Sequence, residues 1–188
     1  MPIGWGAAAV TYRLTCPPAH DDALGARLVS SAVLCATADR GARIGGDLYE
    51  VLATEHGVRA VIGDVRGHGL GAVRTVAAVL GSFREAAHDE PEPAGVLRRL
   101  ERAMARHLRE RKDGEQSPAD ADAGLPAGEE FVTVLLLEFL PDGEVRALNR
   151  GHPWPHLLTG ARAEPLARTG PLPPLGPFPL PPGLPVVP

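Results

Sequence analysis

The sequence lacks the features that define several large classes of protein. Cysteine occurs only at Cys16 and Cys35, which fit no metal-ligand spacing and are expected to be free thiols in a reducing cytoplasm. No stretch approaches the roughly 18 consecutive apolar residues of a membrane span. The N-terminal residues have neither the basic start nor the long apolar core of a signal peptide. These absences predict a cytoplasmic protein without a transmembrane segment.

Lysine is nearly absent as well, since Lys112 is the only one and the other basic residues are arginines. The net charge of −4 gives no basic surface for nucleic acid or for an anionic membrane. The 188 residues, of which 44% are apolar and 22% charged, suit one globular domain with a sizeable core. Composition therefore excludes several partners without selecting an activity.

The most informative segment, residues 44–71, reads IGGDLYEVLATEHGVRAVIGDVRGHGLG. It contains two strand-like runs, Leu48–Thr54 and Val58–Gly63, joined by a short turn at Glu55–Gly57. Apolar residues occupy both faces of the second run, which predicts a hairpin buried on one side and largely covered on the other.

An acidic residue stands at the outer end of each run. Asp47 lies eight residues before Glu55 and Asp64 eight residues after His56, so a hairpin closing at this turn sets the two carboxylates opposite each other. Facing side chains of antiparallel strands have Cβ atoms about 5 Å apart, where like charges repel. A divalent cation would relieve that repulsion, since hard cations take carboxylate oxygens. A slip of one residue in register would turn a side chain to the other face.

The alternative for these carboxylates is that both are solvated strand-end residues. Glycine lets the backbone approach a ligand closely, and glycines surround both aspartates, at Gly45, Gly46, Gly63, Gly67, Gly69 and Gly71. This setting favours a built site.

Periodicity predicts two helices after the hairpin. The first spans Leu70–His88, with apolar positions at Leu70, Val73, Val76, Ala77, Leu80, Phe83 and Ala87. The second runs from Pro93 to about Arg111, with an apolar stripe at Val96, Leu97, Leu100, Met104 and Leu108. Its opposite face is rich in arginine and is expected to be solvated.

Further strands are predicted at Arg27–Asp39, Glu130–Leu140, Glu144–Asn149 and Trp154–Thr159, with a loop at residues 112–129. From Pro171 onward half of the residues are proline, so this part is expected to be extended along the surface or disordered. Strands that flank a helical pair, with antiparallel hairpins, predict an α+β domain. The expected division is an extension over residues 1–26, a domain over residues 27–176 and a proline-rich tail over residues 177–188.

Four motifs together resemble the metal-dependent protein phosphatases of the PPM class, and most closely the stage II sporulation protein E type: IGGDLYEV, IGDVRGHGLGA, FVTVLLLEFLPDGEV and NRGHPWPHLL. The resemblance covers residues 31–176. It implies an αββα sandwich of two antiparallel sheets with helices on the outer faces. It also implies a pair of Mn²⁺ or Mg²⁺ ions that activates water for attack on phosphoserine or phosphothreonine. The implied substrate is a phosphorylated regulatory protein such as an anti-anti-sigma factor, and a homodimer is one assembly that the resemblance allows.

The resemblance assigns roles to individual residues. Asp64 would bridge both metals, Val65 would offer its backbone carbonyl, and Asp47 would bind directly or through water. His68 would be a general acid or would place a water molecule, with a structural hydrogen bond in the turn as the alternative. The residues expected around the substrate or behind the ligands are Gly46, Gly67, Gly69, Asn149 and His152, of which Asn149 could hold the turn that contains His152.

The chain also departs from the family pattern. Arg66 and Arg150 stand where smaller residues are usual, and each is either a phosphate ligand or a solvent-exposed side chain. The later metal-binding aspartates of the family do not occur before residue 188, so the domain is expected to be incomplete at its C-terminus. Too few carboxylates would weaken metal binding, which leaves a second reading, a non-catalytic module that binds a regulatory partner.

A third reading is a nucleotide-binding enzyme, because residues 67–72 fit the pattern G-x-G-x-x-A after a strand. Asp64 would then set a negative charge beside a pyrophosphate. The predicted hairpin also replaces the crossover that a dinucleotide-binding unit needs.

Overall fold

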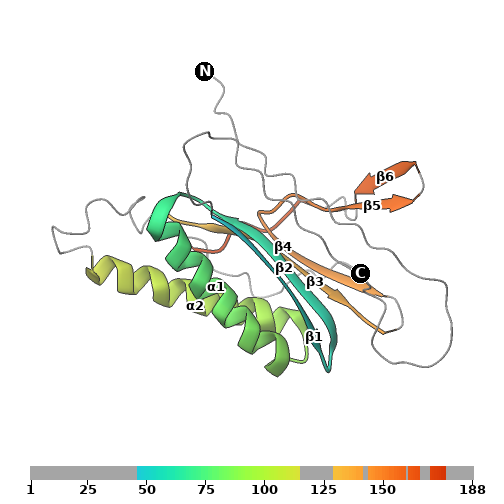
Figure 1. Ribbon diagram of the computed structural model, residues 1–188, viewed down its shortest axis with the longest axis horizontal. Helices are drawn as coiled ribbons and strands as arrows, with labels where there is room; N and C mark the ends of the chain where they lie inside the picture. The colour runs from blue at the N-terminus through green and yellow to red at the C-terminus, as the bar shows by residue number, and fades with distance from the viewer. Residues whose placement is uncertain (1–45, 115–128, 142–143, 160, 166–169, 177–188) are drawn as a thin grey trace, which may run out of the picture.

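The computed structural model describes residues 46–114, 129–141, 144–159, 161–165 and 170–176. A four-stranded antiparallel sheet in the order β1-β2-β3-β4 carries two long helices on one face, and a separate two-stranded sheet, β5-β6, projects from it (Figure 1). The elements are β1 (Asp47–Thr54), β2 (Gly57–Val65), α1 (Gly69–Asp89), α2 (Pro93–Gly114), β3 (Val132–Phe139), β4 (Val145–Arg150), β5 (His156–Thr159) and β6 (Arg162–Pro165). The α+β class with antiparallel sheets is therefore confirmed.

The first hairpin closes where the sequence predicts. Its register runs from Asp47 opposite Asp64 to Thr54 opposite Gly57. In the turn, the Thr54 hydroxyl accepts a hydrogen bond from the His56 N–H at 3.1 Å and lies 2.8 Å from the Gly57 carbonyl oxygen. Gly57 has a φ of 121°, which disfavours a side chain. These local contacts fix the register that the aspartate pair depends on.

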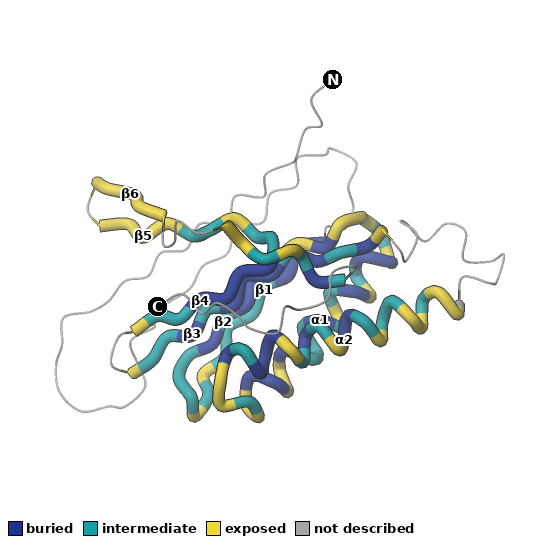
Figure 2. The backbone as a smooth tube through the Cα atoms, turned by 180° about the vertical axis from the view of Figure 1, so that it is seen from behind, coloured by how far each residue is buried: buried dark blue, intermediate teal, exposed yellow. Residues whose placement is uncertain are grey.

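The core lies between the sheet and the helices, as the dark segments of Figure 2 show. The second helix presents its predicted face, with Val96, Leu97, Leu100 and Met104 fully buried. The predicted stripe of the first helix is confirmed in part: Phe83 and Ala87 are buried, and Val76 and Leu80 pack against the core. Two of its positions are wrong, because Leu70 is 69% exposed and Ala77 is exposed. The residues buried in α1 are Gly71, Ala72, Thr75, Val79, Phe83, Ala86 and Ala87. This helix packs on both the sheet and α2, so it is apolar around most of its circumference and periodicity does not fix its rotation.

A buried ion pair joins the sheet to the end of α1. Arg59 on β2 and Glu138 on β3 are directly opposite each other, and Arg59 Nε donates to Glu138 Oε1 at 2.8 Å. The same guanidinium donates to the carbonyls of Ala87, Glu90 and Pro91 at 2.8, 2.5 and 2.9 Å. It thereby satisfies carbonyl groups that the end of a helix leaves without intrahelical partners.

Beyond β4 the chain differs in two ways from the sequence prediction. The predicted strand Trp154–Thr159 begins only at His156, and it pairs with β6, which the sequence did not predict. Residues 170–176 are extended, as one of the two expectations has it. They are not merely on the surface, because Leu175 is fully buried and exchanges backbone hydrogen bonds with Val132 at 3.0 and 2.9 Å.

Some predictions fall outside the described residues: the extension over residues 1–26, the strand at Arg27–Asp39, and residues 115–128 and 177–188. The division of the chain into three parts therefore stays a prediction. Of the helices in the described residues, none combines the length and apolarity needed to cross a membrane.

Candidate functional site

The two aspartates face each other at one end of the sheet. Asp47 on β1 and Asp64 on β2 are register partners, so both side chains lie on the same face of the sheet. Partial burial and then the charge of Asp47 raise the pKa of the Asp64 carboxyl above its ordinary value. The charge of Asp47 thus acts on Asp64 in the direction that the spacing predicts, and the Asp64 side chain stays open to solvent on one side.

A threonine and a histidine extend this row of side chains. Thr133 on β3 lies directly across from Asp64, and its hydroxyl accepts a hydrogen bond from the Asp64 N–H at 3.1 Å. The Thr133 hydroxyl is also 3.0 Å from His152 Nδ1. Burial lowers the pKa of His152, and the charge of Asp47 acts in the opposite direction. His152 therefore belongs to the same site as the aspartates.

The sequence did not single out Thr133. Its only signal is a polar residue at the start of an apolar strand, and this gains meaning once the register sets it beside Asp64. A prediction of strand pairing between β2 and β3 would have been needed to find it.

The turn that carries His152 is tied down by Asn149. The Asn149 amide nitrogen donates to the His152 carbonyl at 2.7 Å, and the His152 N–H donates to the Asn149 side-chain oxygen at 2.8 Å. Gly151 between them has a φ of 72°, a conformation in which a side chain would be strained. The main chain at His152 is therefore held on both sides.

The backbones of Gly46 and Val65 come close together beside the two aspartates. The Val65 N–H donates to the Gly46 carbonyl at 2.9 Å. A Cβ atom on Gly46 would lie 2.3 Å from the Val65 carbonyl oxygen, so only glycine fits there. The Val65 carbonyl therefore lies next to Asp64 along the chain, and residue 46 has no side chain that would cover it.

His68 lies apart from this row. It directly precedes α1 with an extended backbone, φ −149° and ψ 171°, and its side chain makes no capping hydrogen bond. It is exposed, and the neighbouring Gly67 and Gly69 adopt φ values of 125° and 76°. In the described residues the histidine that is connected to Asp64 by hydrogen bonds, through Thr133, is His152 and not His68.

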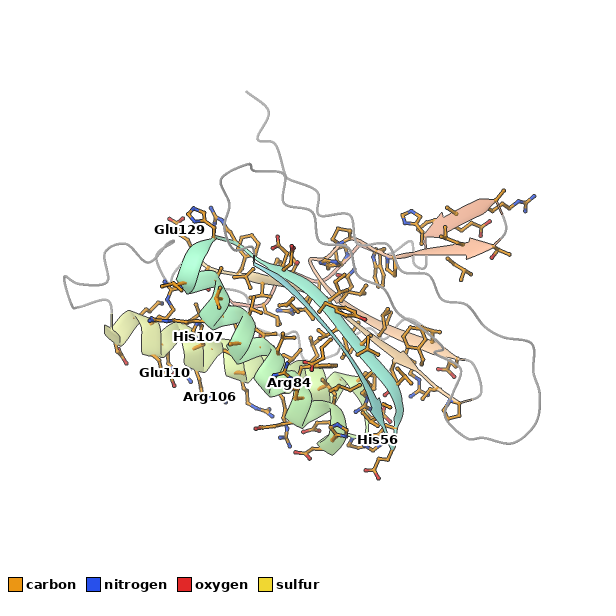
Figure 3. All side chains as sticks on the ribbon, viewed as in Figure 1. His56, Arg84, Arg106, His107, Glu110 and Glu129 are labelled. Atoms are coloured by element: carbon orange, nitrogen blue, oxygen red, sulfur yellow. The ribbon has the colours of Figure 1, made fainter. Side chains whose placement is uncertain are left out.

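The two unusual arginines have different surroundings. The Arg66 guanidinium stacks 5.4 Å above the Phe131 ring and donates to the Glu129 carbonyl at 3.2 Å, with about half of the side chain exposed. Glu129 lies at the end of the sheet where α1 begins, and His56 lies at the other end, in the hairpin turn (Figure 3). Arg150 is fully buried and donates to the Pro174 carbonyl at 3.2 Å. Both expectations for Arg150 are therefore wrong, because it supports residues 170–176.

The donors at this end of the sheet fit a divalent cation in kind. Two facing carboxylates and a nearby carbonyl are oxygen ligands, which Mg²⁺ and Mn²⁺ prefer. They do not fit in number, since the described residues contain no group of three or more His, Cys, Asp or Glu side chains that could hold a metal. The described side chains would supply only part of a coordination shell. The nucleotide-binding reading is wrong, because all four strands of the main sheet are antiparallel.

Several solved structures are similar to this chain. The RsbU and RsbW domains of Rv1364c from Mycobacterium tuberculosis are 26% identical, with a TM-score of 0.53, over 79% of this chain and 37% of that one. The PPM Ser-Thr phosphatase MsPP from Mycobacterium smegmatis is 16% identical, with a TM-score of 0.47, over 66% and 47%. A stage II sporulation E family protein from Thermanaerovibrio acidaminovorans is 15% identical, with a TM-score of 0.43, over 63% and 52%. The chain thus spans less than two thirds of each structure.

A search of curated proteins finds no match. The family model of stage II sporulation protein E matches residues 54–185, well over half of the chain. The matched range contains three of the four motifs and includes Asp64, Thr133 and His152, and it begins after Asp47. The chain belongs to the stage II sporulation protein E family.

Proposed function

We propose that this chain is part of a metal-dependent protein serine/threonine phosphatase. The observation that carries the proposal is the pairing of Asp47 with Asp64 at the end of the sheet, in a chain of this family. Two like charges in register are unfavourable unless a cation balances them. A phosphoryl group is itself anionic, so a site of carboxylates needs that cation before it can accept one.

Asp64, Asp47 and the Val65 carbonyl would hold the ions, which we propose are two Mn²⁺ or Mg²⁺. When bound, such a pair activates water and neutralises the charge that builds up on the phosphoryl oxygens. The protein contributes the alignment of the ligands, because Thr133 bonds the backbone of Asp64 and Gly46 leaves room for the Val65 carbonyl.

We propose a phosphorylated regulatory protein as the substrate, of the anti-anti-sigma type. One similar structure contains an RsbU domain together with an RsbW domain, which supports a role next to another regulatory protein. A polypeptide substrate is also compatible with a site on an open sheet end, where Asp64 is exposed.

A second candidate function is a non-catalytic module of the same fold that binds a regulatory partner. It is favoured by the small number of acidic ligands, since the described residues offer no group of three. The two candidates differ in hydrolysis and agree in fold.

Hydrolysis of a phosphoserine peptide in millimolar Mn²⁺ tests the proposal, together with calorimetric titration of Mn²⁺. We expect Asp64→Ala to abolish and Asp47→Ala to weaken Mn²⁺ binding. Glu55→Ala is the matched control, because it removes a carboxylate from the turn at the far end of the same hairpin. If the folded wild-type protein does not hydrolyse the peptide above background, the phosphatase proposal fails and the non-catalytic module remains. Unchanged Mn²⁺ binding in Asp64→Ala would overturn the site itself.

A further inference from the structure

The hydroxyl of Thr133 occupies the junction between Asp64 and His152. It accepts the Asp64 N–H at 3.1 Å, and it lies 3.4 Å from the Asp64 carbonyl oxygen and 3.0 Å from His152 Nδ1, which accepts in one tautomer of the ring and donates in the other. A hydroxyl has one proton to donate. The contact with His152 Nδ1 is the shorter of the two and favours donation of the hydroxyl proton to this nitrogen. In the alternative arrangement, Nδ1–H donates to the hydroxyl and the hydroxyl donates to the Asp64 carbonyl.

The choice between these two arrangements decides where the imidazole carries its own proton. A ring nitrogen that accepts a hydrogen bond is unprotonated, and a neutral imidazole then carries its proton on Nε2. Burial lowers the pKa of His152, which favours the neutral ring. In the first arrangement the side chain of His152 presents one N–H donor, on the nitrogen that does not face Thr133.

The ring has little freedom to turn away. Asn149 holds the main chain of His152 by two hydrogen bonds, of 2.7 and 2.8 Å, and Thr133 holds the side chain. A Cβ atom on Gly151 would lie 2.6 Å from Pro174 Cγ, so the turn also packs closely against residues 170–176. A donor fixed in this way loses little conformational entropy when it binds an anion.

We propose that Thr133 holds His152 as the Nε2–H tautomer and that this N–H donates to a phosphoryl oxygen of the substrate bound at Asp47 and Asp64. Thr133 is then a positioning residue, and His152 is the group that recognises the phosphoryl oxygen. The inference rests on the proposed function, because it names the residue that would bind the substrate at that site. A neutral donor suits this place, since it binds an oxygen anion without adding a charge between the carboxylates.

The tautomer is tested first by long-range ¹H–¹⁵N spectra of the histidine-labelled protein, in which loss of signals in His152→Gln identifies His152 among seven histidines. We expect the wild type to carry the proton on Nε2. Thr133→Val should mix the two tautomers, and Thr133→Ser should restore the wild-type signals. A proton on Nδ1 in the wild type, or unchanged spectra in Thr133→Val, would overturn the assignment.

Recognition is tested with a peptide that carries a non-hydrolysable phosphonate analogue of phosphoserine, measured by fluorescence anisotropy in Mn²⁺. His152→Ala and Thr133→Val should raise its Kd by roughly 10- to 100-fold, the effect of losing one hydrogen bond to a charged group. Thr133→Ser should restore the affinity, and the exposed His156→Gln serves as the matched histidine control. Calorimetry should show wild-type Mn²⁺ affinity in His152→Ala.

The outcomes separate this inference from the proposed function. A wild type that binds the phosphonate peptide but hydrolyses no phosphoserine contradicts the proposed function and leaves the recognition by His152 in place. Wild-type peptide affinity in His152→Ala, or a wild type that does not bind the peptide, overturns the recognition. A parallel loss of Mn²⁺ affinity in His152→Ala would place the imidazole among the metal ligands and overturn it as well.

Discussion

Gly46→Ala should damage both the fold and the proposed metal site, because its Cβ atom has no room. That atom would lie 2.3 Å from the Val65 carbonyl oxygen and 3.0 Å from Val65 Cβ. The carbonyl belongs to the backbone of β2 and cannot rotate away like a flexible side chain. The end of the hairpin must therefore open, and Asp47 moves with it.

The cost can be derived from these contacts. Overpacking by one methyl group against a fixed backbone costs about 1–3 kcal/mol. Opening the strand end would also lengthen the hydrogen bond from the Val65 N–H to the Gly46 carbonyl, now 2.9 Å, which contributes about 0.5–1.5 kcal/mol. We expect a loss of about 2 kcal/mol in unfolding free energy, together with weaker Mn²⁺ binding.

Urea denaturation in EDTA measures the first effect and calorimetric titration of Mn²⁺ the second. Gly81→Ala is the matched control, because nothing lies within 4 Å of its added Cβ atom in the middle of α1. Alanine has the higher helix propensity, so this control should gain about 0.5–1 kcal/mol. A Gly46→Ala protein as stable as the wild type and with the same Mn²⁺ affinity would refute the reasoning.

Two further predictions concern buried polar groups. Arg59→Met leaves the Glu138 carboxylate and several carbonyls without the Arg59 donor, so urea denaturation should show a loss of about 3–5 kcal/mol in the free energy of unfolding. Glu138→Gln should reduce the free energy of unfolding clearly less. Equal losses in the two variants would contradict this account. His107 bonds Thr75 at 2.8 Å, and burial lowers its pKa from the ordinary 6.5. Its contribution to stability is therefore present above pH 6.5 and is lost as the pH falls below that value toward the lowered pKa. Denaturation between pH 7.5 and 5 should show a smaller decline in His107→Gln, and parallel curves would exclude the effect.

The hairpin and the aspartate pair were predictable because local sequence determines them. The turn residues fix where the strands fold back, and a period of two then sets which residues face each other. Counting outward from the turn was sufficient to bring Asp47 and Asp64 together, and the structure has this register.

The rest of the site was not predictable in the same way. Thr133 and Asp64 are 69 residues apart, and His152 joins them only through the pairing of β3 with β2 and a turn after β4. No local pattern contains that pairing. The same holds for Arg59, which alternates with apolar residues like a solvent-facing side chain and is instead fully buried against Glu138, 79 residues away.

The signs of the charges distinguish the site from the remainder of the sheet. Arg59 and Glu138 are buried between the sheet and the helices, and each neutralises the other. Glu130, next to the start of β3, is likewise buried and paired with Arg111 of α2. Asp47 and Asp64 are the reverse case, because they are cross-strand partners of like sign on the opposite face, at the end where the sheet is open to solvent. Opposite charges in register stabilise a sheet, and like charges in register destabilise it. A pair of the second kind, braced by Thr133 and by the Gly46 contact, supports the proposed cation, because a ligand of positive charge would offset the repulsion.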